Sequence, residues 1–479
     1  MDLNEITRET LAKATELTSR NIAKASLAKA TADGSSYLTG YNLKDTAILL
    51  QNLSSEWRKT IPRRTVGGKQ YDYRRIVSVS PSGAFFAADG TRSNGISLTT
   101  DSKTVSFASY GRFYDMSWEA VLASKNFEDV RARVQTLAML EALREEEAMI
   151  LGSTVSAVGA PTGLSVTGAA SGGSLGAGTY YATVCAVTME GVIQTVVARP
   201  DANGKFDASA TVPALPTRGV SPASTEANSG ALSGSTNQIT LSCTAVKNAV
   251  AYLWGVGTST GAEKLQCITT APKVVITNIN TTGAALPSSD TTANSNGFAG
   301  IIPQLNASGS GAYVKTLGAK LSSPTGSHIP EIADAIQAIF DNTKTQPSRI
   351  VCGGYDARVL DAAYGTGPSN DRVNYYVQMG ADGPMFKPVR EIPSPIDGSS
   401  IPMEVSTWLP GGTILFLQDR VTYPSAEIPA PWEMVMGADV TGLDYAMTKP
   451  CYEAEIRLNG ALVGYAPALQ GMLVDVRNY

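Results

Sequence analysis

Residues Phe127–Leu151 read FEDVRARVQTLAMLEALREEEAMIL, and this stretch decides the fold. Its apolar residues recur at close to the helical period, which predicts a single long helix. Asn126 is a suitable N-cap, the acids after it suit the positive end of the helix dipole, and Gly152 is expected to end the helix. About 25 residues at 1.5 Å per residue make a rod of about 38 Å, long enough to run across a whole domain.

Three consecutive glutamates stand near the end of this stretch: Glu145, Glu146 and Glu147. Neighbouring residues on a helix point in different directions, so these side chains do not form a pair of catalytic carboxylates. We expect them to lie on a solvated face or in a charged patch between subunits.

Upstream of this helix, the sequence predicts a long two-stranded arm. Tyr71–Val79 and Lys103–Ser109 have strand-like alternation, with a polar, glycine-containing tip over 81–101. An isolated hairpin is marginally stable in water, so we expect the arm to lie on a neighbouring subunit. Two basic pairs flank its first strand: Arg63, Arg64, Arg74 and Arg75. They are predicted to contact acidic groups of a neighbour or to favour solubility.

The first 35 residues favour helix and balance their charges, which indicates a solvated or docking arm.

Downstream of the helix, charge becomes scarce. From Val155 to Gly300 only 12 of 146 residues are charged, which indicates a separate domain. Strand patterns with turn-rich connections predict a small β-sandwich there. These patterns are Thr179–Val187, Gln238–Cys243, Ala251–Val256 and Lys273–Thr277. The run Thr240–Tyr252 resembles the core strand pair of a fibronectin type III or immunoglobulin-like module. The edges, 159–163 and 284–297, are predicted to be linkers.

After this segment the pattern becomes α/β. Pro330 is placed as in the first turn of a helix rich in isoleucine. Strands are expected at Arg349–Cys352 and Thr413–Leu417, with a helix at Tyr355–Tyr364. Asn459–Gly460 is a strong hairpin signal, so we expect the chain to turn there between two strands.

Composition narrows the function classes. The chain has 479 residues, 43% of them apolar, a formal net charge of −4 and one histidine, His328. This apolar content excludes a wholly disordered chain, and no run approaches the about 18 apolar residues of a membrane span. The acidic N-terminus differs from a secretory signal peptide. One histidine argues against histidine-based triads, and phosphate-binding, dinucleotide-binding and nucleophile-elbow motifs do not occur. We therefore expect a non-enzyme with no catalytic residue, cofactor or metal.

The order of these parts resembles the major capsid proteins of tailed bacteriophages, which have the Hong Kong 97-type fold. Tyr110–Glu119 looks like the return from the E-loop of that family into its spine helix, and Phe127–Leu151 looks like the spine helix. Gly297–Pro303 resembles the segment that follows the spine helix, and Gln346–Gly353 resembles part of the A-domain. The resemblance covers 337 residues and is interrupted by the charge-poor segment.

The resemblance implies an α+β fold with an inserted all-β sandwich. The implied domains are an N-terminal arm (1–61), an E-loop hairpin (62–113), a P-domain with the spine helix (114–154), an inserted immunoglobulin or fibronectin III-like domain (155–296), and the A-domain with the remainder of the P-domain (297–479).

The same resemblance implies a structural role. The chain would be a major capsid subunit that forms hexamers and pentamers of an icosahedral phage head around double-stranded DNA. It would belong to the virion, assemble in the host cytoplasm, meet portal, scaffolding or decoration proteins and no membrane, and display the inserted domain outside.

Two alternatives stay open. A microbial surface or tail protein with an immunoglobulin-like adhesive module would be a monomer. An encapsulin-type compartment shell would enclose cargo protein rather than DNA. An unrecognised hydrolase is a more distant reading, because carboxylate chemistry needs no histidine.

Overall fold

The computed structural model describes residues 56–478, apart from short internal gaps. These gaps are 82–85, 87–88, 90, 93–94, 125–128, 198–199, 202, 209–211, 326–327, 366–376, 381–382, 387–390, 422–427, 429 and 448. The chain divides into two compact units, one of 1–52 with 122–129 and one of 53–121 with 130–479. Most of the predicted N-terminal arm, and the predicted cap Asn126, lie outside the described residues. The second unit is described below.

The predicted long helix is confirmed as α4, which spans Val130–Gly152. Its burial is uneven along its length. The first half is largely exposed, with Leu137 among its exposed apolar side chains, whereas the last turns are buried, including Ile150 and Leu151. The helix therefore packs on the rest of the unit mainly through its C-terminal end.

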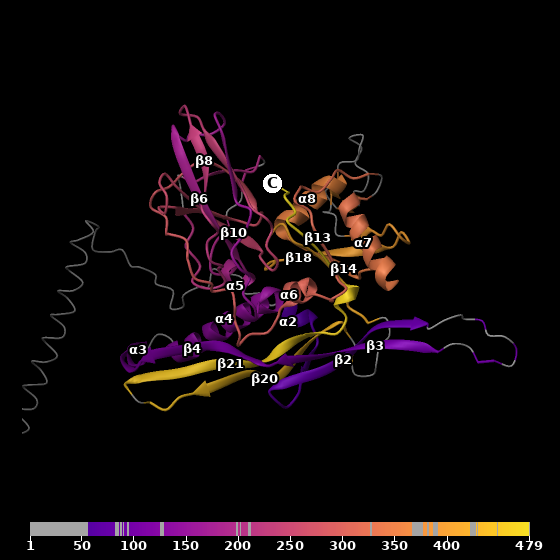
Figure 1. Cartoon of the computed structure of the whole chain (residues 1–479). Coiled ribbons are helices and arrows are strands. Elements are labelled where there is room, and N and C mark those ends of the chain that lie inside the picture. Colours follow the sequence, from indigo (N-terminus) through magenta and orange to yellow (C-terminus); the bar gives the residue numbers. More distant parts are fainter. Residues whose placement is uncertain are drawn as a thin grey trace, which may run out of the picture. The chain divides into compact units, whose positions relative to one another are not determined.

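A four-stranded sheet lies along α4 and has the order β1-β20-β21-β4 (Figure 1). Its strands are β1 (Arg63–Thr65), β4 (Ala108–Ser117), β20 (Trp432–Asp444) and β21 (Cys451–Gly464). The segment predicted to return from the arm into the helix is β4, paired with β21 over its whole length and followed by the short helix α3 (Trp118–Ser124).

The predicted turn at Asn459–Gly460 is wrong, because β21 continues through both residues. Asn459 pairs with Ser109 and Gly460 with Ala108 on one side, and both face β20 on the other. A Cβ at position 460 would lie 2.8 Å from the carbonyl oxygen of Val435, so glycine permits close approach at a bulge rather than a turn.

The predicted arm is confirmed as a two-stranded sheet of β2 (Gln70–Pro81) and β3 (Ile96–Ser106). β2 and β3 form a sheet of two strands only, and nearly all of β3 is exposed. At its root, Tyr71 and Tyr73 pack against Val435 and Val463 of the larger sheet and against Tyr465, which follows β21.

The C-terminal part forms a six-stranded mixed sheet, in the order β13-β22-β19-β14-β18-β17. Its strands are β13 (Tyr313–Thr316), β22 (Gly471–Val474), β19 (Ile414–Leu417), β14 (Arg349–Gly353), β18 (Ser400–Ser406) and β17 (Glu391–Pro393). The helices α7 (Pro330–Thr343) and α8 (Gly354–Gly365) share a core with it. The predicted helices and the buried strands β14 and β19 are confirmed. The C-terminal part also contains α6 (Ile301–Asn306), the 3-10 turn η1 (Pro467–Leu469) and a separate two-stranded sheet of β15 (Val377–Gly380) and β16 (Gly383–Phe386).

Residues 155–296, the segment predicted to be an inserted domain and called the insert below, contain two four-stranded sheets and one short helix, α5 (Met189–Val192), among their described residues. One sheet has the order β11-β10-β6-β8, from Lys264–Thr269, Ala251–Gly257, Gly178–Val187 and Ala227–Leu232. The other has the order β5-β9-β12-β7, from Ser165–Ala169, Gln238–Ser242, Lys273–Asn278 and Lys205–Asp207. Both sheets contribute to one core around Trp254.

The described chain as a whole is a mixed α+β structure with more strands than helices. Within the described residues, no helix combines the length and the apolar character that a membrane span requires.

Candidate functional site

The three predicted glutamates lie in the last turns of α4, and each contacts a different part of the chain. Glu146 and Glu147 have no exposed surface, so the expectation of a solvated face or an intersubunit patch is wrong for these two. A buried carboxylate needs a charged or hydrogen-bonded partner, and both have partners within the chain. Together they make the end of α4 a junction of charged groups.

Glu147 caps the first described helix, α2 (Trp57–Thr60). Its two carboxylate oxygens accept the backbone N–H groups of Trp57 at 2.8 Å and Arg58 at 2.9 Å. The first N–H groups of a helix have no partner within the helix, and a carboxylate at the positive end of the helix dipole is a suitable acceptor for them. Burial nevertheless raises the pKa of Glu147, because the loss of water outweighs the two hydrogen bonds and Glu146 and Glu56 add like charge.

Two arginines and a tyrosine contact the carboxylate of Glu146. Arg58 lies 2.6 Å and Arg63 lies 2.9 Å from its oxygens, and the Tyr110 hydroxyl donates to it at 2.8 Å. Asp439 of β20 accepts from Arg58 as well, at 2.6 Å. Burial, together with the neighbouring carboxylate, holds the pKa of Tyr110 well above its ordinary value. Glu146 therefore joins α4 to α2, β1 and β4.

Arg64 connects the arm to the larger sheet, and Arg75 connects the two strands of the arm to each other. Arg64 lies 3.2 Å from Glu433 and donates to the Tyr71 hydroxyl at 2.6 Å, while the Tyr465 hydroxyl donates to Glu433 at 2.7 Å. Arg75 pairs with Asp101 across the two strands of the arm, at 2.9 Å. These contacts hold the root of the arm in a polar network.

Arg74 differs from the other predicted arginines. It is exposed, and the residues that the structure describes offer it no ion-pair partner. Arg63, Arg64 and Arg75 have partners within their own chain, so Arg74 is the member of the set best placed for a contact between subunits. That role stays a prediction.

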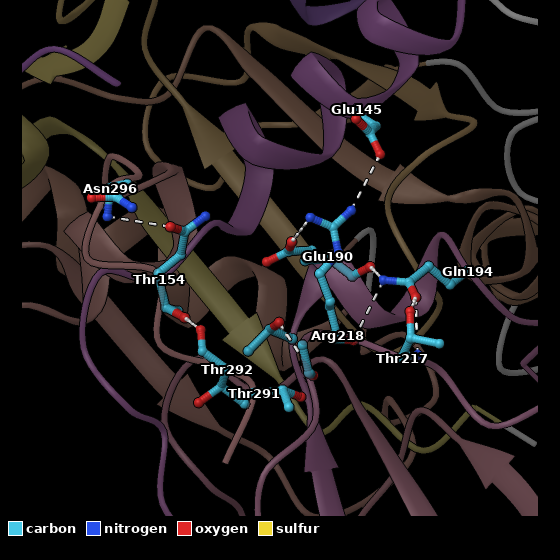
Figure 2. Close-up of polar contacts among 12 residues, drawn as sticks. Glu145, Thr154, Glu190, Gln194, Thr217, Arg218, Thr291, Thr292 and Asn296 are labelled. Atoms are coloured by element: carbon cyan, nitrogen blue, oxygen red, sulfur yellow. Dashed lines mark hydrogen bonds and ion pairs between the residues drawn. The ribbon is translucent and has the colours of Figure 1, made fainter. Parts of the chain in front are cut away.

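Glu145 connects α4 to the insert, as Figure 2 shows. It pairs with Arg112 of β4 and lies 3.6 Å from Arg218, whose other side lies 3.4 Å from Glu190 in α5. Burial raises the pKa of Glu145, while the two arginines lower it. A pocket of about 290 Å³ beside this group is also lined by Glu455 and Arg457.

The ends of the insert meet at a hydrogen-bonded neck. Thr154 donates through its hydroxyl to the carbonyl of Thr292 at 2.7 Å, and its own carbonyl accepts the N–H of Asn294 at 3.1 Å (Figure 2 shows the contact of Thr154 with Thr292). Thr292 also accepts the N–H of Val158 at 2.9 Å. The expected linker over 284–297 is therefore wrong in its second half, where the side chain of Thr292 is buried and bonded.

Sequence reasoning missed the partners of these glutamates, above all Arg58, Arg112 and Arg218. One signal was present for Arg218, since it is one of the few charged residues in a charge-poor segment. A rare charge in such a segment marks a position with a specific partner, here Glu145 and Glu190. Among the described residues, no cluster of three or more histidine, cysteine or acidic side chains is arranged to hold a metal ion.

A change of pH should report on Glu147. Because its pKa is raised above the ordinary 4.5, the folded chain holds this proton more tightly than the unfolded chain. Its contribution to stability is complete below the unfolded pKa and is lost as pH rises through the folded pKa. We expect Glu147→Gln to gain stability relative to the wild type as pH rises through this window, measured by denaturant unfolding at several pH values.

Glu453 is the control for that experiment. Hydrogen bonds from Lys449 and Cys451 lower the pKa of its carboxyl, so its contribution has the opposite sign. Glu453→Gln should lose stability relative to the wild type as pH rises. Equal slopes for the two variants would contradict the assignment of a raised pKa to Glu147.

The chain is similar to solved capsid structures over most of its length. These include the capsid of Myoviridae phage XM1 (8% identity, 91% of this chain and 96% of that chain, TM-score 0.44). They also include the cyanophage A-1(L) capsid (10% identity, 92% and 98%, TM-score 0.43) and the capsid of a native GTA particle (9% identity, 93% and 98%, TM-score 0.42). No protein-family model matches the sequence, and a search of curated proteins finds no match.

Proposed function

We propose that this protein is a structural subunit of a self-assembling shell, the major capsid protein of a tailed-phage head. The arm β2–β3 is the observation that carries the proposal. It is a sheet of only two strands, its apolar side chains Ile96 and Leu98 are 69% and 55% exposed, and Phe86 near its tip is 89% exposed. A two-stranded sheet of this kind gains stability only from another surface, and a second copy of the chain supplies one.

The root of the arm supports this interpretation. Arg64, Tyr71 and Glu433 hold the root against the larger sheet. An element that is fixed at its base and apolar at its end is suited to reach a neighbour. Repetition of the same contact around a closed symmetry builds a shell.

The finer assignments belong to the same proposal. The arm corresponds to the E-loop, α4 to the spine helix of the P-domain, and the six-stranded sheet with α7 and α8 to the A-domain. The insert is an immunoglobulin or fibronectin III-like module, supported by its two sheets with a common core. Its two ends meet at Thr154 and Asn294, which suits a module added at one surface point and displayed outside the shell. The work of the chain is association rather than catalysis.

Expression of the full chain tests the proposal. We expect light scattering to detect particles far larger than one subunit, and electron microscopy to show closed icosahedral shells with the insert on the outer face. A stable monomer at high concentration would contradict the proposal and favour the adhesive alternative. Closed shells that carry a dedicated protein cargo in their native source, and no DNA, would favour the encapsulin-type alternative.

A further inference from the structure

We infer that the insert is a clamp on the C-terminal end of α4, and that Arg218 sets the position of this clamp. The insert and the helix then move as one body, and the insert is part of the mechanical frame of the subunit rather than a loosely attached decoration. This inference holds whether or not the subunit forms a shell, because every contact it uses lies within one chain.

Close packing at the helix end is the first observation. A Cβ at Gly152, the last residue of α4, would lie 2.7 Å from the Cβ of Met189 in the insert. A Cβ at Gly300, just after the insert, would lie 2.6 Å from the carbonyl oxygen of Met149. Both distances are too short for a real side chain, so the two glycines allow the insert and the outgoing chain to approach the helix backbone directly.

The apolar contacts lead to the same conclusion. Met189 of α5 is almost wholly buried, yet it belongs to the core that contains Ile150, Leu151 and Ile302 rather than to the core between the two sheets of the insert. Part of the insert thus completes the main core of the subunit. Its removal would expose the buried last turn of α4 to water.

The polar contacts around Arg218 hold the clamp in position. Arg218 lies between Glu145 of the helix and Glu190 of the insert, as Figure 2 shows. The preceding residue Thr217 donates to the Gln194 side chain through both its N–H, at 3.0 Å, and its hydroxyl, at 2.8 Å. Because Gln194 also donates to the carbonyl of Glu190 at 2.8 Å, the backbone that carries Arg218 is tied to α5.

A cation of α4 also contacts the insert directly. Arg144 donates to the carbonyl of Ile193 at 2.9 Å, and its guanidinium lies 5.6 Å from the ring centre of Trp408. Arg144 and Glu145, two neighbouring charged residues of the helix, thus both contact the insert. Arg218 is the useful one to change, because it is 54% exposed and Glu145 keeps Arg112 as a partner after its loss.

Hydrogen exchange in Arg218→Ala tests the clamp. The protected N–H groups of Ser153, Asn294 and Gly300 lie at the neck and report on its opening. A half-exposed ion pair contributes up to about 1 kcal/mol, which is about a fivefold change in an opening equilibrium. We therefore expect peptides covering 148–158 and 288–302 to exchange about fivefold faster in this variant, measured by mass spectrometry on the full chain, with Arg218→Lys in between.

Arg457→Ala is the matched control. Arg457 lines the same pocket and has the same charge, but its ion-pair partner is Glu455 of its own strand. Equal exchange at the neck in the Arg218 and Arg457 variants would overturn the inference. An equal acceleration in the peptides of β14, far from the neck in sequence, would also overturn it, because the effect would then be a general loss of stability.

Discussion

Replacement of Glu146 by alanine is expected to lower the free energy of unfolding by about 3 kcal/mol, the lower end of the range for breaking a buried ion pair. The carboxylate is fully buried, and its loss leaves the guanidinium groups of Arg58 and Arg63 and the Tyr110 hydroxyl without their shared partner. Asp439 retains part of the charge compensation, which is why the lower end applies. Denaturant unfolding at neutral pH measures the loss.

Glu141→Ala is the control on the same helix. Glu141 is 39% exposed and pairs with Arg144 one turn away at 3.4 Å. Such a pair contributes less than about 0.5 kcal/mol, so this variant should unfold almost like the wild type. Similar losses in the two variants would contradict the assignment of the large effect to the buried ion pairs of Glu146.

The largest effect on assembly is expected from the arm. Ile96 and Leu98 lie on the same face of β3, and both are exposed within their own chain. The double variant Ile96→Asp, Leu98→Asp should fold with a melting temperature close to that of the wild type but should fail to form particles. The physical reason is that two carboxylates cannot be buried against an apolar surface of a neighbour. Light scattering gives the particle size, and circular dichroism gives the folding.

Ser97→Asp with Thr99→Asp supplies the matched control, since these residues alternate with Ile96 and Leu98 along the strand and point to its opposite face. The control carries the same added charge on the same arm. If both double variants assemble into particles, the apolar face of the arm does not join subunits. If neither folds, the arm is part of the core of the subunit, and its proposed role as a free connector is wrong.

The elements that could be predicted from sequence are the long ones with a consistent local preference. The long helix is confirmed because residues of high helix propensity, such as Ala, Leu, Glu and Arg, fill it, although its apolar side chains do not keep to one face. The arm is confirmed because its strand pattern extends over many residues. The turn predicted at Asn459–Gly460 does not form, because both residues pair with strands on either side of β21. Local chemistry favours a turn there, but the pairing of a whole central strand outweighs it.

The candidate site could be predicted only in part. Three consecutive glutamates are easy to recognise as candidate site residues, but their burial depends on partners far away in sequence. Trp57 is 90 residues from Glu147, and Asp439 is 381 residues from Arg58. No local pattern carries that information. Of the residues predicted to join subunits, Arg74 is exposed and has no described ion-pair partner. The others form ion pairs or hydrogen bonds within the chain.

The contact between Arg58 and Asp439 also has a consequence for the order of events during synthesis. The ribosome releases Arg58 and Arg63 long before it releases β20, which supplies both Asp439 and the pairing partner of β1. Until then the cluster around Glu146 lacks one of its carboxylates, and β1 lacks its neighbour. The nascent chain therefore completes this part of its structure late, after almost the whole subunit has been made, as expected for a topology with very distant contacts.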